Sequence, residues 1–143
     1  MNDRDLAKIE KTTGLTLPTA YATLLREFPA ELLALLKFDE PDDRMLFTDA
    51  RTIVHWNQFF RAPEYEYENS YGEMCTFPTS HIVIGANSGG DFYHIDTERK
   101  HCSVLFWCHE TGEITQCAKN LDAFVREIFS STADAILYVL DLS

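Results

Sequence analysis

The stretch from Ile82 to Asp96, IVIGANSGGDFYHID, decides how the centre of this chain folds. Its glycine-rich middle suggests a phosphate-cradling loop, which needs a strand before it and a helix after it, so that the helix N-terminus faces the anion. Residues 82–84 fit the strand, but residues 91–96 are aromatic and β-branched and lack helical periodicity. The sequence therefore predicts strand, turn, strand, with Gly89 and Gly90 supplying the positive φ that a tight turn needs.

The spacing of the glycines also argues against a nucleotide. No Lys-Ser or Lys-Thr pair follows them, and the spacing of Gly85, Gly89 and Gly90 matches neither the Walker nor the dinucleotide fingerprint. Without a following helix the loop offers no row of free N–H groups to an anion. We therefore expect no nucleotide here, and no cofactor elsewhere in the chain.

Helical periodicity dominates the N-terminal half. A first helix is capped by Asn2 or Asp3 and ended by Gly14, and a second begins at Pro18. A third is expected over residues 31–38, followed by an acidic turn, a strand at residues 45–47 and a helix capped by Asp49. The inward faces of the second and fourth helices are predicted to be Tyr21, Leu24, Leu25 and Phe28, and Ile53, Trp56, Phe59 and Phe60.

The C-terminal half reads as a meander. Residues 62–80 lack periodicity and are predicted to be irregular. Four strands follow, over residues 81–86, 91–96, 102–109 and 113–118, and their short links imply antiparallel pairing. Asn120 caps a last helix with Leu121, Phe124, Val125 and Ile128 inward. Residues 1–143 are thus predicted to form one α+β domain with N-terminal helices, a mostly antiparallel central sheet and a C-terminal helix.

Charge restricts the class of partner. Twelve basic against 23 acidic residues give a net charge of −11, which repels nucleic acid and anionic membranes. Residues 39–73 alone carry nine acids and three arginines, a net −6 that would attract a basic protein. No apolar run approaches the roughly 20 residues that span a bilayer, and the charged start MNDRDLAKIEK is no signal peptide. We expect a soluble, cytoplasmic protein.

Four cysteines raise the question of a metal site. The run from His101 to His109 holds Cys102 and Cys108, but on a strand these lie about 20 Å apart, too far for one tetrahedral zinc. Without a signal peptide the thiols should be free, and buried cysteines behave as small hydrophobes. We expect no metal.

The segment EYEYENSYGE is the candidate partner-binding surface. It combines steering charge with aromatic residues that often anchor interfaces, namely Glu64, Tyr65, Glu66, Tyr67, Glu68, Tyr71 and Glu73. A competing interpretation is a loop or edge strand whose tyrosines fold onto the core while the glutamates face water. The enzyme alternative rests on His94 and Asp96, which would share a strand face as an acid–base pair, although no second convergent group supports it.

The order of motifs along almost the whole chain resembles the Smi/Knr-type cell-wall-assembly-regulator family of the SUKH superfamily. The residues that carry the resemblance are Leu17, Pro18, Tyr21, Gly85, Gly89, Gly90, Asp91 and Trp107. It implies an α+β domain with a curved sheet, in which the glycine turn is a fold signature and Asp91 satisfies loop N–H groups. It implies no recognised catalytic activity. Bacterial members are commonly immunity proteins that block a toxin, and fungal relatives are regulators and scaffolds. A basic toxin domain is the partner we expect, with a regulatory scaffold as the alternative.

Overall fold

The computed structural model describes residues 1–28, 30 and 44–142 of the 143. The expected third helix over residues 31–38 and the acidic turn that follows it lie outside the described residues. No helix in the described part of the chain is long and apolar enough to cross a membrane.

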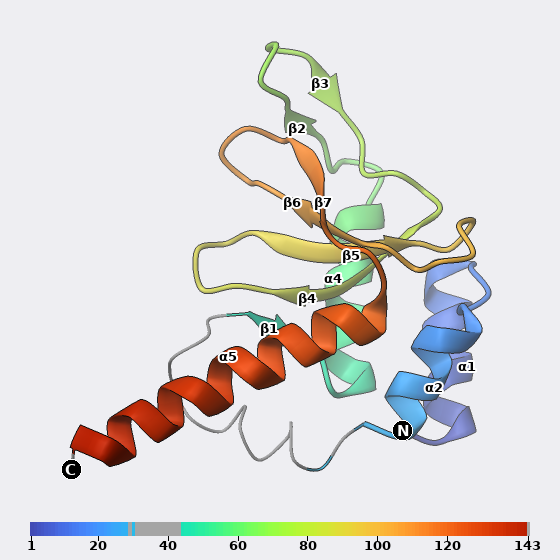
Figure 1. Ribbon diagram of the computed structural model, residues 1–143. Helices are drawn as coiled ribbons and strands as arrows, with labels where there is room; N and C mark the ends of the chain where they lie inside the picture. The colour runs from blue at the N-terminus through green and yellow to red at the C-terminus, as the bar shows by residue number, and fades with distance from the viewer. Residues whose placement is uncertain (29, 31–43, 143) are drawn as a thin grey trace.

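Among the described residues, helices open and close the chain and the strands lie between them, with one helix inserted after the first strand (Figure 1). The helices are α1 (Asp3–Thr13), α2 (Thr19–Arg26), α4 (Ala50–Arg61) and α5 (Leu121–Leu142). The strands are β1 (Met45–Leu46), β2 (Tyr67–Glu68), β3 (Met74–Cys75), β4 (His81–Ala86), β5 (Phe92–Asp96), β6 (Val104–Trp107) and β7 (Ile114–Ala118). One five-stranded antiparallel sheet has the order β1-β4-β5-β6-β7, and β2 pairs with β3 in a separate hairpin. The predicted α+β class and the meander are confirmed.

The sheet is covered on both faces, by α4 behind it and by α5 in front in Figure 1. Successive strand residues point to opposite faces, so Phe92 and Tyr93 of β5 reach different layers. The Phe92 ring lies 4.8 Å from Trp56 and 4.9 Å from Phe60, both on α4. The Tyr93 ring lies 5.0 Å from Phe124 on α5. Two aromatic layers therefore hold the sheet between the helices.

The central glycine loop is a turn between β4 and β5, as predicted. Gly90 has φ +90°, a conformation that side chains rarely adopt, but Gly89 is not in this region, so the expectation of positive φ was wrong for Gly89. Asn87 Oδ1 accepts hydrogen bonds from the N–H groups of Gly89 and Asp91, each at 3.0 Å. The Asn87 side chain thus fixes the conformation of the loop, a role that the sequence analysis did not predict.

Gly85 is required for a different reason. Its φ is not positive, yet a Cβ at this position would collide with the carbonyl oxygen of Met45 on β1. Gly85 faces Leu46 in the pairing register, so the missing side chain lets β1 lie directly against β4. The close approach, rather than a turn, explains this glycine.

Most helix boundaries were predicted. Asn2 and Asp5 form a capping box on α1, Gly14 ends it with φ +70°, and the Asp49 side chain accepts from the N–H of Thr52. The prediction of which α4 side chains point inward was wrong at one position. Phe59 is 47% exposed. Ile53, Asn57 and Phe60 are the buried residues of this helix.

Two further expectations fail locally. Residues 62–80 contain the β2–β3 hairpin, although they were predicted to be irregular. The strand expected over residues 102–109 is shorter in the structure, where β6 spans only Val104–Trp107. It starts late because Cys102 has φ +45° and leaves the extended conformation. Strands of two residues are too short to produce a periodic signal.

Candidate partner-binding surface

The β2–β3 hairpin is a built structure rather than a loose loop. Its tip is organised by Asn69, whose Oδ1 accepts from the N–H groups of Tyr71 and Glu73, each at 2.9 Å. The Asn69 N–H in turn donates to the Glu73 carbonyl at 2.9 Å. This turn presents Tyr71 outward, with 86% of its surface exposed. In Figure 1 the hairpin projects beyond the rest of the fold, at the far end from the C-terminus.

The other two tyrosines of the segment fold back on the core. The Tyr65 ring lies 5.1 Å from Phe60, and the Tyr67 ring lies 5.5 Å from Trp107. Burial raises the pKa of both phenols, and for Tyr65 the neighbouring Tyr67 adds to the effect. Both rings are half-buried against core aromatics, and that the two tyrosines anchor a partner stays a prediction. The competing interpretation, tyrosines inward and glutamates outward, describes them.

The carboxylates alternate with these tyrosines and face water. Four exposed glutamates lie along the segment: Glu64, Glu66, Glu68 and Glu73. Within the described part of the chain none of the four forms an ion pair. Exposed apolar side chains accompany them, with Met74 60% and Phe59 47% exposed. Uncompensated negative charge beside exposed apolar surface is what a basic protein partner would complement.

A hollow lies at the base of this surface, where α4 ends. It has a volume of about 460 Å³ and is lined by His55, Gln58, Phe59, Ala62, Glu64, Tyr65 and Glu66. We call it the α4 groove. Two of the candidate acids therefore border a concavity that includes Phe59, a residue the sequence placed in the core.

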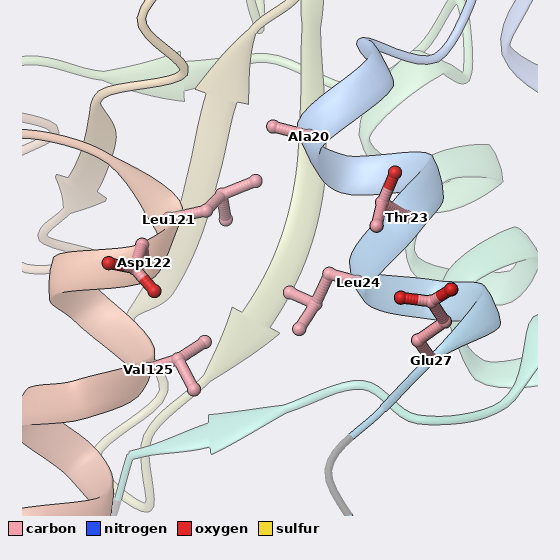
Figure 2. A pocket seen from close by; sticks show the side chains of 7 residues that line it. All are labelled: Ala20, Thr23, Leu24, Glu27, Leu121, Asp122 and Val125. Atoms are coloured by element: carbon pink, nitrogen blue, oxygen red, sulfur yellow. The ribbon is translucent and has the colours of Figure 1, made fainter.

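A second hollow separates α2 from the start of α5. Figure 2 shows Leu24 on one helix and Leu121 and Val125 on the other pointing into the same space, with Glu27 and Asp122 beside them. Its volume is about 280 Å³. Leu24 and Val125 were predicted to be core positions, and both are only partly buried because this gap separates the two helices.

The proposed acid–base pair is not arranged for catalysis. His94 is fully buried, and its Nδ1 lies 2.8 Å from the Nδ1 of His81. Asp96 lies instead beside His81 Nε2, at 3.6 Å, and beside Arg99, at 3.5 Å. Burial, together with the neighbouring His81, lowers the pKa of His94 to about 3. A ring closed off from solvent cannot meet a substrate, so the interpretation of His94 and Asp96 as an active site is corrected.

Asp91 links two turns. Its Oδ1 accepts from the backbone N–H of His109 at 3.0 Å and lies 2.7 Å from His109 Nδ1, while its Oδ2 accepts from Asn87 at 3.0 Å. Desolvation raises the pKa of Asp91, but the hydrogen bonds from His109 and Asn87 outweigh it and hold the pKa below its usual range. The loop N–H that Asp91 satisfies belongs to the β6–β7 turn.

The remaining motif residues lie in the core or at the start of a helix, and the cysteines form no cluster with other metal-ligating side chains among the described residues. Leu17, Tyr21 and Trp107 are buried, and Pro18 precedes the first residue of α2. Among the described residues no three metal-ligating side chains come together. The four cysteines carry no disulfide: Cys75, Cys102, Cys108 and Cys117.

A family model described as the SMI1 / KNR4 family (SUKH-1) matches residues 1–127. The chain belongs to this family. The resemblance inferred from the order of motifs is therefore confirmed, and the match includes the hairpin, the α4 groove and the first turns of α5. No curated protein and no solved structure matches this SUKH-1 chain.

Proposed function

We propose that this SUKH-1 protein is a non-enzymatic binding protein, namely a cytoplasmic immunity protein that binds and blocks a basic toxin domain. The observation that carries the proposal is the projecting hairpin, which carries the exposed carboxylates of Glu68 and Glu73 together with the exposed ring of Tyr71. Family membership supports a role of the immunity or Smi/Knr-like type.

The mechanism would be occlusion. A carboxylate-rich surface increases the encounter rate with a basic partner, because unlike charges steer the two proteins before contact. A stable complex buries about 800 Å² on each partner, which the hairpin and the end of α4 could supply together. Tyr71, rather than Tyr65 or Tyr67, is the aromatic side chain free to enter a pocket on the toxin. Blocking then needs no chemistry from the immunity protein.

A regulatory scaffold is the second candidate, since the family also includes Smi/Knr-like proteins. Both functions need a protein partner and both could use the same acidic surface. They differ in one property of the partner: an immunity protein protects the cell from a toxic domain, whereas a scaffold binds a protein that is harmless when expressed alone.

The deciding experiment has two stages. The tagged chain is used to capture partners from its native host at low salt, and mass spectrometry identifies them. The captured domain is then expressed alone and together with this protein, and growth is followed. Killing that co-expression prevents supports immunity. A captured partner that is harmless alone argues for the scaffold.

Charge-reversal variants locate the surface. Changing Glu64, Glu66 and Glu68 to Lys takes the net charge from −11 to −5, because each reversal adds two positive units. The matched control reverses Glu10, Glu27 and Glu98, which lie on α1, beside α2 and after β5, and reaches the same net charge. We expect the first variant to lose association rate with the partner and the control to retain most of it. Equal protection by the first variant and the parent would place the interface elsewhere.

A further inference from the structure

The α4 groove combines two aromatic walls with two carboxylates. Phe59, 47% exposed, lies with its ring centre 5.1 Å from that of Tyr65, and the two ring planes meet at 57°. Glu64 and Glu66 flank Tyr65 in sequence, are exposed, and line the same hollow. A hydrogen bond from the N–H of Tyr65 to the carbonyl of Ala62, at 2.9 Å, fixes the turn that carries them.

The groove also lies at the end of a helix whose dipole favours a cation. α4 has 12 residues and ends at Arg61, so its last carbonyls place partial negative charge at the groove. Arg61 donates to the carbonyls of Thr79 and His81, at 3.1 and 2.7 Å, and is not among the residues that line the hollow. The carboxylates and the helix terminus therefore both favour a bound cation.

We propose that the α4 groove is the receptor for an arginine side chain of the partner protein, an inference that rests on the proposed function. A guanidinium is planar, stacks on aromatic faces and binds a carboxylate through two parallel hydrogen bonds. Phe59 and Tyr65 provide the faces, and Glu64 or Glu66 provides the carboxylate. A lysine ammonium is a more strongly hydrated point charge and gains less from the ring faces. The groove therefore selects arginine over lysine, whereas the hairpin tip attracts any basic surface.

The test uses three short peptides as probes: acetyl-Gly-Arg-Gly-amide, its lysine analogue and its citrulline analogue, which keeps the shape of arginine without the charge. Each is titrated at low salt into the isotopically labelled full chain, and backbone amide shifts are followed by NMR. We expect the arginine peptide to shift the amides of residues 58–62 and 64–66 and to bind at least about threefold more tightly than the lysine peptide. The citrulline peptide should give no saturable shift.

Two double variants and one single variant distinguish binding in the groove from a general effect of negative charge. Glu64→Gln with Glu66→Gln should weaken arginine-peptide binding at least about fivefold, whereas Glu68→Gln with Glu73→Gln, an equal change of charge on the hairpin, should change it less than about twofold. Phe59→Leu keeps an apolar side chain but removes the ring, and should abolish the preference for arginine over lysine. Thermal melting checks that each variant is folded.

The outcomes are distinct. Equal binding of arginine and lysine peptides, or equal loss in the two double-Gln variants, overturns the inference and leaves only a general acidic surface. If the peptides fail but the chain still captures a toxic basic domain and protects against it, the groove assignment is wrong while the proposed function stands. If the arginine peptide binds as expected but the captured partner is harmless, the proposed function fails while the groove remains an arginine site.

Discussion

The side chain of Asn57 on α4 forms two hydrogen bonds with the backbone of Val83 on β4. Its Nδ2 donates to the Val83 carbonyl and its Oδ1 accepts from the Val83 N–H, both at 2.9 Å. The pairing register between β4 and β5 shifts between Val83 and Gly85, so an irregularity in the ladder lies at this point. Asn57 is only 1% exposed and connects the helix to that irregular strand position.

Replacing Asn57 with Leu should destabilise the fold strongly. Two buried backbone groups of Val83 lose these partners, and each unsatisfied buried group costs roughly 1–3 kcal/mol. We therefore expect the free energy of unfolding to fall by on the order of 2–4 kcal/mol. Urea unfolding at neutral pH measures it. Gln58→Ala, on the exposed neighbouring position, serves as the control and should change stability by less than about 0.5 kcal/mol. Equal stability of the Leu variant and the parent would refute the bonding role.

The two adjacent glycines of the β4–β5 turn should respond differently to alanine. Gly90→Ala forces a side chain into φ +90° and should cost roughly 1–3 kcal/mol, although the space around a new Cβ is open to 3.7 Å. Gly89→Ala meets only ordinary contacts, the nearest at 3.5 Å, and should be close to neutral. The melting temperatures of the Gly89→Ala and Gly90→Ala variants, compared with that of the parent, test this prediction. A larger loss at Gly89 than at Gly90 would contradict the backbone explanation.

Replacing Tyr67 should mainly reduce stability, whereas replacing Tyr71 should mainly affect binding of the partner. Tyr67→Ala removes a ring packed on Trp107 and should cost roughly 1–3 kcal/mol, less than a fully buried aromatic because Tyr67 is partly exposed. Tyr71→Ala should leave stability within about 0.5 kcal/mol of the parent but speed dissociation from the partner. Chemical unfolding and surface-based binding kinetics test the two halves. Similar melting temperatures for the two variants would show that Tyr67 does not support the core.

The parts of the fold that were predictable depend on long, regular patterns. The strands before and after the central glycines follow from apolar and aromatic runs bounded by turn residues, and the caps Asn2, Gly14 and Asp49 follow from local chemistry. The inward face of α4 could not be predicted in full. Helical periodicity favours Phe59 over the polar Asn57, but the irregularity in β4 creates a need for a buried amide, and that need appears only when helix and strand meet.

The candidate partner-binding surface was likewise predictable only in part. The alternation of acids and tyrosines was visible in the sequence, and so was the competing reading in which tyrosines turn inward. The inward packing of Tyr67 and Tyr65 depends on Trp107 and Phe60, which are distant in sequence and provide the rings that the two tyrosines contact. The turn Asn69-Ser-Tyr-Gly72 was the available signal for the hairpin, because Asn favours side-chain hydrogen bonds to nearby N–H groups.

The pair formed by the half-buried His81 and the fully buried His94 gives the fold a sensitivity to acid. The two Nδ1 atoms are 2.8 Å apart, so one can donate only while the other accepts, and the pair holds together only if at least one ring is neutral. Burial lowers the pKa of both rings, that of His94 to about 3. The charged groups acting on the pair are Asp96, Glu98, Arg61 and Arg99, and their effects partly cancel.

Stability should therefore fall as pH is lowered from 7.5 to 5. The unfolded chain binds a proton at His94 with a pKa near 6.5, whereas the folded chain does not do so until about pH 3, so protons favour unfolding throughout this window. The expected loss from His94 alone is about 2 kcal/mol, and His81 adds to it. Asp91 and Asp96, whose pKa values are lowered, lose their stabilising contribution only at lower pH, near and below their unfolded pKa of 3.8. Urea unfolding at both pH values measures the slope. The variant His94→Phe should be markedly less pH-sensitive whatever its absolute stability, and an unchanged slope would show that the buried ring is not the source.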